Sequence, residues 1–315
     1  MKPIGGFLEL EQSNKSEAFH EKAISLSTGR SCLRLILETI NPIKIYIPYY
    51  ICEVVIDTII SQNIKFEYYG LNKNLEPEKL NLKKNEYLFY INYFGIKNNV
   101  ICRLISRHKK NLIIDNSQGF YEKSYSHLWS FNSARKFFGV PDGAYLYSPI
   151  EIKTQFPRNK KVIYNHLIQR LNGKQKQAFQ NFKKNENLLN SKLQNMSIIS
   201  ESMLVNIDYE MISKKRKENF NYLNSVLKSS NFFKLPNRIN STPLCYPYLP
   251  QRSIDRSKLH NLNLFIPTYW ERNRFTVENK FQFEKHLIQN LLPLPIDQRY
   301  SKSDMDIIIE SLKSV

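Results

Sequence analysis

The residue of this sequence best placed for covalent chemistry is Lys136. It stands in the segment SFNSARKFFGVPDGA, residues 130–144, after Arg135 and before Phe137 and Phe138. Desolvation by the two rings and repulsion by a neighbouring guanidinium both favour the neutral amine, which is the form that condenses with a carbonyl group. The alternative interpretation is a solvated surface lysine, since most lysines are exposed.

A carboxylate and an amide, Asp115 and Gln118, follow the apolar run of residues 112–114. A carboxylate at the end of a strand can hold a heteroaromatic ring nitrogen in its protonated, electron-withdrawing form, and Gln118 can hydrogen-bond a neighbouring ring oxygen. Asp115 can equally cap the turn that follows it. The segment alone supports both interpretations.

The third segment of interest is TGRSCL, residues 28–33, just before a predicted helix. Free N–H groups at a helix start bind anions, Gly29 allows a ligand to approach the backbone, and Ser31 adds a hydroxyl. Together these features suit a phosphate group. An ordinary N-cap preceded by a turn accounts for the same residues.

These segments fall at strand ends and helix starts in an alternating pattern. Strands are predicted at 44–47, 64–69, 87–92, 112–115, 127–131 and 144–147, and helices at 31–39, 51–61 and 100–108. The alternation predicts an α/β fold with a mostly parallel central sheet flanked by helices. Ligands of such sheets bind at the carboxyl ends of the strands, so the three segments are expected to meet there. Residues 128–147 leave no room for a crossover helix, which predicts a hairpin or bend.

The second half of the sequence has a different pattern. Residues 162–228 show long, polar helical periodicity, with Gly173 as a predicted break between two helices. Prolines and short strand patterns follow from residue 232, and further helices are predicted at 282–290 and 302–313. We place a domain boundary near residue 205, between a large cofactor-binding α/β domain, 1–205, and a smaller α+β domain, 206–315.

The chain carries a formal net charge of +18, from 46 Lys and Arg against 28 Asp and Glu. The lysines occur in pairs along the whole chain, which we interpret as a solvated surface; we expect no nucleic-acid partner, although the field can steer anionic substrates. No secretory signal and no window of 18 uncharged apolar residues is present, which predicts a cytoplasmic protein without membrane contact. The six histidines show no metal-ligand spacing, so no metal is expected.

The order of the three segments resembles that of the DegT/StrS-type (DegT/DnrJ/EryC/StrS) sugar aminotransferases, fold type I enzymes that depend on pyridoxal phosphate (PLP). That family carries an SGTxAL-like phosphate turn, a D-x-A-Q/H strand end, and an SFHxxK segment followed by a Gly-(Glu/Asp)-Gly turn. This chain has TGRSCL, DNSQGF and SFNSARKFFGVPDGA in the same order. The resemblance spans most of the chain.

The resemblance implies roles for individual residues. Lys136 would bind the cofactor covalently, Asp115 would partner its pyridine nitrogen, and Gln118 would face its phenolic oxygen. The phosphate would be held by donors from four residues: Gly29, Arg30, Ser31 and Ser130.

The resemblance also implies an activity. The protein would move an amino group, usually from glutamate, to a nucleotide-linked keto sugar in surface-polysaccharide synthesis. It would work as a homodimer on small-molecule substrates. The alternatives are a sugar-nucleotide dehydratase of the same fold, against which the retained lysine argues, and a non-catalytic relative that binds a sugar nucleotide.

Several positions depart from the family pattern. Counting forward from Ser130 places the family's lysine at Arg135, whereas counting back from Asp142 places it at Lys136. We prefer Lys136, because a guanidinium does not deprotonate and cannot form an imine. Asn132 replaces a histidine. The aromatic residue that stacks on the cofactor falls near Cys52, which leaves three tyrosines as candidates for that role: Tyr49, Tyr50 and Tyr93.

Candidate substrate contacts are Tyr93, Trp270 and Arg272. A tryptophan and an arginine can stack on a nucleotide base and pair with a diphosphate. The same segment, residues 269–274, can equally form a surface ion-pair cluster over an aromatic core.

Overall fold

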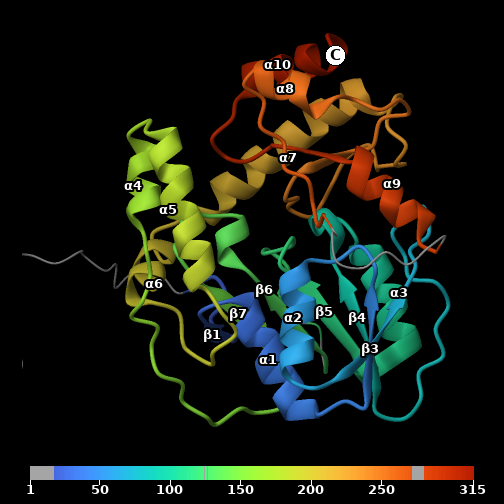
Figure 1. The fold of residues 1–315 in the computed structure, drawn as a ribbon, viewed down its shortest axis with the longest axis vertical. Coiled ribbons are helices and arrows are strands. Elements are labelled where there is room, and N and C mark those ends of the chain that lie inside the picture. Colours follow the sequence, from blue (N-terminus) through green and yellow to red (C-terminus); the bar gives the residue numbers. More distant parts are fainter. Residues whose placement is uncertain (1–17, 124, 126, 272–279) are drawn as a thin grey trace, which may run out of the picture.

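The protein is described by a computed structural model covering residues 18–123, 125, 127–271 and 280–315. A seven-stranded sheet carries most of the first half of the chain, and a two-stranded sheet lies in the second half. Figure 1 shows α1 and α2 packed against the larger sheet, and α7, α8 and α10 at the opposite end of the molecule. No described helix has the length and apolar character needed to cross a membrane.

The large sheet has the strand order β1-β7-β6-β5-β4-β2-β3. Strands β2 to β6 run parallel to one another, whereas β7 is antiparallel to both β6 and β1. The strand bounds are β1 Ile24–Leu26, β2 Lys44–Pro48, β3 Lys65–Tyr69, β4 Glu86–Ile91, β5 Leu112–Asn116, β6 Trp129–Asn132 and β7 Ala144–Tyr147. The predicted mostly parallel sheet is confirmed, and so is the bend between β6 and β7.

The helices follow the predicted alternation closely. Their bounds are α1 Gly29–Ile40, α2 Glu53–Ser61, α3 Asn98–His108, α4 Asn165–Leu171, α5 Gln175–Leu188, α6 Ile198–Leu204, α7 Tyr209–Leu227, α8 Arg256–Asn261, α9 Gln282–Asn290 and α10 Lys302–Lys313. The predicted break at Gly173 is confirmed: it separates α4 from α5 with a φ of +74°, a conformation that favours glycine. The short strand β1 was not predicted, because three residues carry no readable period.

The buried side chains form three clusters. The largest lies around β2, β4 and β5 and the helices that cover them, and strand β5 is buried along its whole length, as expected where helices cover both faces of a parallel sheet. A second cluster joins α7 and α10 to the two-stranded sheet of β8, Tyr246–Tyr248, and β9, Leu292–Leu294. A third covers β7 and contains the aromatic side chains that follow Lys136. The domain boundary near residue 205 stays a prediction.

The strand directions give the sheet two chemically different edges. At the carboxyl edge, the strand ends lead into five segments: 27–29, 49–52, 92–95, 117–118 and 133–136. At the amino edge lie the segments that enter β2, β4 and β5, residues 43, 79–85 and 107–111. Every segment that the sequence singled out for chemistry in the first half of the chain is therefore at the carboxyl edge.

Candidate active site

Lys136 ends a short 3₁₀ turn, Ala134–Lys136, that follows β6. Its side chain is exposed to water. Burial nevertheless lowers the pKa of its ammonium group, because protein surrounds the amine on most sides. The side chain is thus open to water and yet close enough to the protein for its pKa to fall, and both properties favour a reactive lysine.

The charges that act on Lys136 identify its neighbours. Burial has the largest effect and lowers the pKa of the ammonium group. Arg135 and Arg30 also lower this pKa, whereas Cys52 and Asp115 raise it. These residues come from four different segments of the carboxyl edge. The structure therefore brings Lys136, Asp115 and Arg30 into one electrostatic cluster, as the sequence pattern predicts for strand ends.

Asp115 lies near the end of β5 and is 5% exposed. Burial raises the pKa of its carboxyl to about 6, although hydrogen bonds from Ser117 and the charge of Lys136 favour the ionised form. The backbone N–H of Ser117 donates to Asp115 Oδ1 at 2.7 Å. Asp115 thus both caps its turn and remains a buried carboxylate that a cationic ring nitrogen would stabilise.

The first turn of α1 faces the turn after Asp115. A Cβ atom placed on Gly29 would lie 3.5 Å from Ser117 Oγ. Thr28 is the N-cap, and its hydroxyl oxygen accepts the N–H of Ser31 at 3.0 Å. The N–H groups of Gly29 and Arg30 have no partner within the helix, since the first turn offers no acceptor. They are the anion-binding donors of this helix start.

The hydroxyl groups of Ser31 and Ser130, two predicted phosphate ligands, do not lie free beside Asp115. The Ser31 hydroxyl is buried and donates to the carbonyl of Lys192 at 2.7 Å. Ser130 pairs in register with Ile114, whereas Asp115 pairs with Phe131. Since neighbours in register share a face of the sheet, the Ser130 hydroxyl lies across the sheet from Asp115. It is buried there without a hydrogen-bond partner among the described residues.

Gln118 ties two turns of the carboxyl edge together. Its Oε1 accepts the backbone N–H of Phe94 at 2.6 Å, and its side chain is buried. The two segments approach so closely that a Cβ atom on Gly95 would clash with the Gln118 carbonyl oxygen. The Gln118 amide nitrogen points away from this contact and keeps its two donor hydrogens for another acceptor.

Arg135 and Lys136 point to different surroundings. Arg135 forms an ion pair with Glu186 of α5, and burial lowers the pKa of its guanidinium to about 10, with Arg30 adding to the effect. Lys136 instead lies near Cys52 and Asp115, whose charges raise the pKa of its ammonium group. This geometry supports Lys136, the residue preferred on chemical grounds, as the reactive one of the two.

The three tyrosines considered for ring stacking are core residues. The Tyr49 ring stacks on Phe281 at 4.5 Å, and the Tyr93 hydroxyl donates to the carbonyl of Tyr50 at 2.8 Å. Tyr50 and Tyr93 are at most 1% exposed and pack edge-on against Trp270, with ring centroids 4.5 and 6.0 Å away. These contacts place the three rings in the aromatic core, and a stacking role for any of them stays a prediction.

Cys52 is the neighbour of Lys136 that the sequence interpretation missed. It is half-buried at the N-cap of α2, and burial raises the pKa of its thiol. The available signal was its coincidence with the family's stacking aromatic. Of the predicted substrate contacts, Tyr93 is buried, Trp270 is partly exposed, and Arg272 lies outside the described residues.

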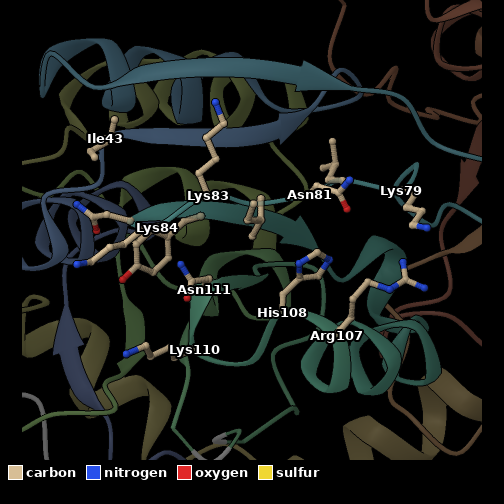
Figure 2. A pocket seen from close by; sticks show the side chains of 13 residues that line it. Ile43, Lys79, Asn81, Lys83, Lys84, Arg107, His108, Lys110 and Asn111 are labelled. Carbon is tan, nitrogen blue, oxygen red and sulfur yellow. The ribbon is translucent and has the colours of Figure 1, made fainter.

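A cavity of about 1030 Å³ lies elsewhere. It opens at the amino edge of the sheet, and Figure 2 shows Lys83, Lys84, Lys110 and Arg107 spreading outward from it. Open α/β sheets bind their ligands at the other edge. Burial and proximity of titratable groups, rather than cavity volume, therefore mark the candidate site. No described group of His, Cys, Asp and Glu could hold a metal ion.

The fold is shared with solved sugar aminotransferases. A DegT/DnrJ/EryC1/StrS aminotransferase from Brucella abortus has a TM-score of 0.63 at 14% identity, with 94% of this chain and 88% of that chain covered. CalS13, a sugar aminotransferase from Micromonospora echinospora, has a TM-score of 0.63 at 11% identity, with 94% of this chain and 88% of that chain covered. S. venezuelae DesV, in complex with a ketimine intermediate, has a TM-score of 0.65 at 12% identity, with 93% of this chain and 84% of that chain covered.

These similarities confirm the predicted fold, that of the fold type I aminotransferases. No family model and no curated protein matches the sequence. The likeness to these proteins is therefore one of fold.

Proposed function

We propose that this protein is a PLP-dependent aminotransferase that acts on a keto sugar. The observation that carries the proposal is the cluster at the carboxyl edge, where a lysine of lowered pKa lies within electrostatic reach of a buried carboxylate beside an anion-binding helix start. A carbonyl-reactive amine, a partner for a ring nitrogen and a phosphate site are the three features that PLP requires.

The described residues fit the cofactor. Asp115 is a buried carboxylate, which a cationic partner would stabilise, and the guanidinium of Arg135 has a buried Nε for which no described residue is an acceptor. The α1 start offers two N–H groups, from Gly29 and Arg30, to a phosphate. The bound cofactor would supply an electron sink for the carbon from which a proton is removed.

The protein would supply orientation and proton transfer. Asp115 would keep a proton on the ring nitrogen, because its charge is worth more where burial has removed water. Lys136 would accept and return a proton at its Nζ, a task that its lowered pKa favours near neutral pH. Gln118 would orient the ring through its amide nitrogen.

The finer parts of the proposal rest on the resemblance and on the charge. We propose glutamate as the amino donor, a nucleotide-linked keto sugar as the acceptor, and a homodimer in surface-polysaccharide synthesis. The net charge of +18 would favour the approach of a diphosphate-bearing substrate.

Reductive trapping tests the proposal directly. The purified protein is incubated with PLP and reduced with borohydride, and its peptides are mapped by mass spectrometry. We expect the cofactor mass on the peptide that contains Lys136, and a change in the cofactor's absorbance when glutamate is added before reduction. Absence of any trapped cofactor, or trapping on scattered surface lysines only, would contradict the proposal.

One observation favours a second candidate, a relative that binds a sugar nucleotide without turnover. Cys52 occupies the place of the stacking aromatic, and Tyr49, Tyr50 and Tyr93 are all committed to the core. Calorimetric titration with a nucleotide-linked sugar in the absence of PLP separates the two functions. Tight binding without trapping or amino transfer would select the non-catalytic protein.

A further inference from the structure

The start of α1 is enclosed by two segments that are distant in the sequence. The N–H of Gly143 donates to the carbonyl of Ser27 at 2.7 Å, and the N–H of Ala134 donates to the carbonyl of Gly143 at 3.1 Å. These bonds hold the turn that carries Arg135 against the residues that lead into α1. From the other side, Thr28 Oγ1 donates to the carbonyl of Asn190 at 2.8 Å.

This enclosure concentrates positive charge. Arg30, Arg135 and Lys136 all lie at it, and the positive end of the α1 dipole points into it. The first turn of α1 contains no acidic residue that would offset the dipole. Arg30 lowers the pKa of the Arg135 guanidinium, and both arginines lower the pKa of the Lys136 ammonium, so the three cations act on one another.

Several carboxylates act on these three cations. Glu186 pairs with Arg135, and Asp115 faces Lys136. Asp142, which also acts on Arg135, is fully buried and already accepts hydrogen bonds from three side chains, those of Asn159, Ser197 and Ser200. Asp57 acts on Arg30 in addition, so carboxylates balance the three cations, and the groups that keep a free donor are the N–H groups of the helix start and the Arg135 Nε.

One nitrogen of the Arg135 guanidinium lacks a hydrogen-bond acceptor among the described residues. Its side chain is 14% exposed, and one terminal nitrogen donates to Glu186. Its Nε is buried, and no described residue accepts from it. A buried N–H without an acceptor is costly, so Arg135 is built to receive a further acceptor. A guanidinium is suited to the oxygens of a phosphate, which it binds in a bidentate manner.

We propose that Arg135 is a phosphate ligand, and that Arg135, Arg30 and the N–H groups at the start of α1 form a receptor for the phosphate dianion of PLP. Guanidinium groups would thereby take the place of the hydroxyls of Ser31 and Ser130, which the fold directs elsewhere. This inference rests on the proposed function for the identity of the ligand. The receptor for a phosphate dianion follows from the enclosure itself.

Comparison of PLP with pyridoxal, which lacks the phosphate, isolates the role of Arg135. The dissociation constants of both compounds are measured by absorbance titration for the wild type, Arg135→Gln, Arg135→Lys and Arg158→Gln. Arg158 is a matched control, because it also pairs with a glutamate, Glu201, but is 40% exposed and makes its other side-chain hydrogen bond to the carbonyl of Met196 rather than to α1. The ratio of the two constants measures what the phosphate contributes to binding.

We expect Arg135→Gln to weaken PLP binding by about tenfold or more, the range for a charged hydrogen bond, and to leave pyridoxal binding unchanged. Arg135→Lys should restore part of the preference, and Arg158→Gln should behave as the wild type. Equal losses for PLP and pyridoxal would show that Arg135 only positions Lys136, and an unchanged ratio would show that it does not contact the phosphate. Either result overturns the inference.

A second measurement separates this inference from the proposed function. Thermal unfolding of the wild type and Arg135→Gln is followed with and without inorganic phosphate. Stabilisation of the wild type alone, in a protein that binds neither PLP nor pyridoxal, would support the receptor and refute the cofactor. Equal or absent stabilisation of both proteins by phosphate would overturn the receptor as well.

Discussion

The two edges of the large sheet both carry positively charged side chains, but these differ in how strongly they interact with their neighbours. At the carboxyl edge, Arg30, Arg135 and Lys136 act on one another and on Asp115. At the amino edge, five cations line a groove of about 1030 Å³ (Figure 2): Lys79, Lys83, Lys84, Arg107 and Lys110. All five are exposed, and none forms an ion pair with a described residue.

The comparison shows that the number of charges does not identify a functional site. Exposed charges interact weakly because water and salt screen them, whereas the same charges act strongly on one another where protein has displaced water. The amino edge has a groove of about 1030 Å³, whereas at the carboxyl edge burial raises the pKa of the Asp115 carboxyl to about 6. Perturbed titration beside a strand end is the better guide to chemistry.

Replacement of Lys136 should produce the largest difference between the edges. Lys136→Ala removes the amine that would bond to the cofactor and move the proton, so we expect aminotransferase activity to fall by about 10³-fold or more. Lys84→Ala, at the amino edge, is the matched control and should retain full activity. Single-turnover rates of the half-reaction between the PLP-loaded protein and glutamate, followed by the cofactor's absorbance, check both variants. Comparable losses in the two variants would remove the distinction between the edges.

Replacement of Asp115 should separate stability from function. Its carboxyl has an ordinary pKa of 3.8 and a folded-state value of about 6, so the folded protein holds the proton more tightly than the unfolded chain. The stability that this provides is complete below about pH 4 and is lost as the pH rises through about 6. Asp115→Asn avoids that loss, because an amide does not ionise.

We therefore expect cofactor-free Asp115→Asn to be more stable than the wild type by about 2–3 kcal/mol at about pH 8, and equally stable at about pH 4. The same variant should bind PLP poorly, because the ring nitrogen has lost its partner. Urea unfolding at the two pH values, together with a PLP titration, checks both expectations. A destabilised variant at pH 8 would show that the carboxylate is a structural cap rather than a poised ligand.

Two glycines with almost the same backbone conformation test how tightly the carboxyl edge is packed. Gly95 and Gly173 have φ values of +72° and +74°, but a Cβ atom on Gly95 would clash with the Gln118 carbonyl, whereas one on Gly173 meets nothing within 4 Å. Gly173→Ala should cost about 1 kcal/mol of stability from backbone strain alone. Gly95→Ala should cost at least about 2 kcal/mol more and disturb Gln118. Urea denaturation measures both; equal costs would argue against close packing at this edge.

The sequence predicted the parts of the site that depend on local order along the chain. Asp115 ends an apolar run and Lys136 follows a strand, so the parallel arrangement of strands was enough to bring them to one edge. The position of Ser130 also has a local reason, because side chains alternate along β6 and only every second residue can face the same side of the sheet as Asp115.

Long-range packing decided the rest, and no spacing along the chain encodes it. Arg135 and Lys136 are neighbours that residue counting cannot separate, and Glu186, 51 positions away, is what holds Arg135 in place. Tyr50 and Tyr93 became core residues through Trp270, which arrives from the far end of the chain. Cys52 was left beside Lys136 because the tyrosines near it turn into the core.

Neutralisation of the amino edge should have the smallest effect and is the sharpest test of the comparison. The triple variant Lys83→Gln, Lys84→Gln, Lys110→Gln removes exposed charges that have no described partner, so its stability should change by less than about 0.5 kcal/mol. Any gain from relieved repulsion should disappear as salt is added, since screening acts within about 10 Å at moderate ionic strength. Its PLP and phosphate affinities should equal those of the wild type. If the triple variant instead lost phosphate binding while Arg135→Gln kept it, the anion receptor would lie at the amino edge, and exposed charge around a large groove would have proved a better guide than buried charge at the strand ends.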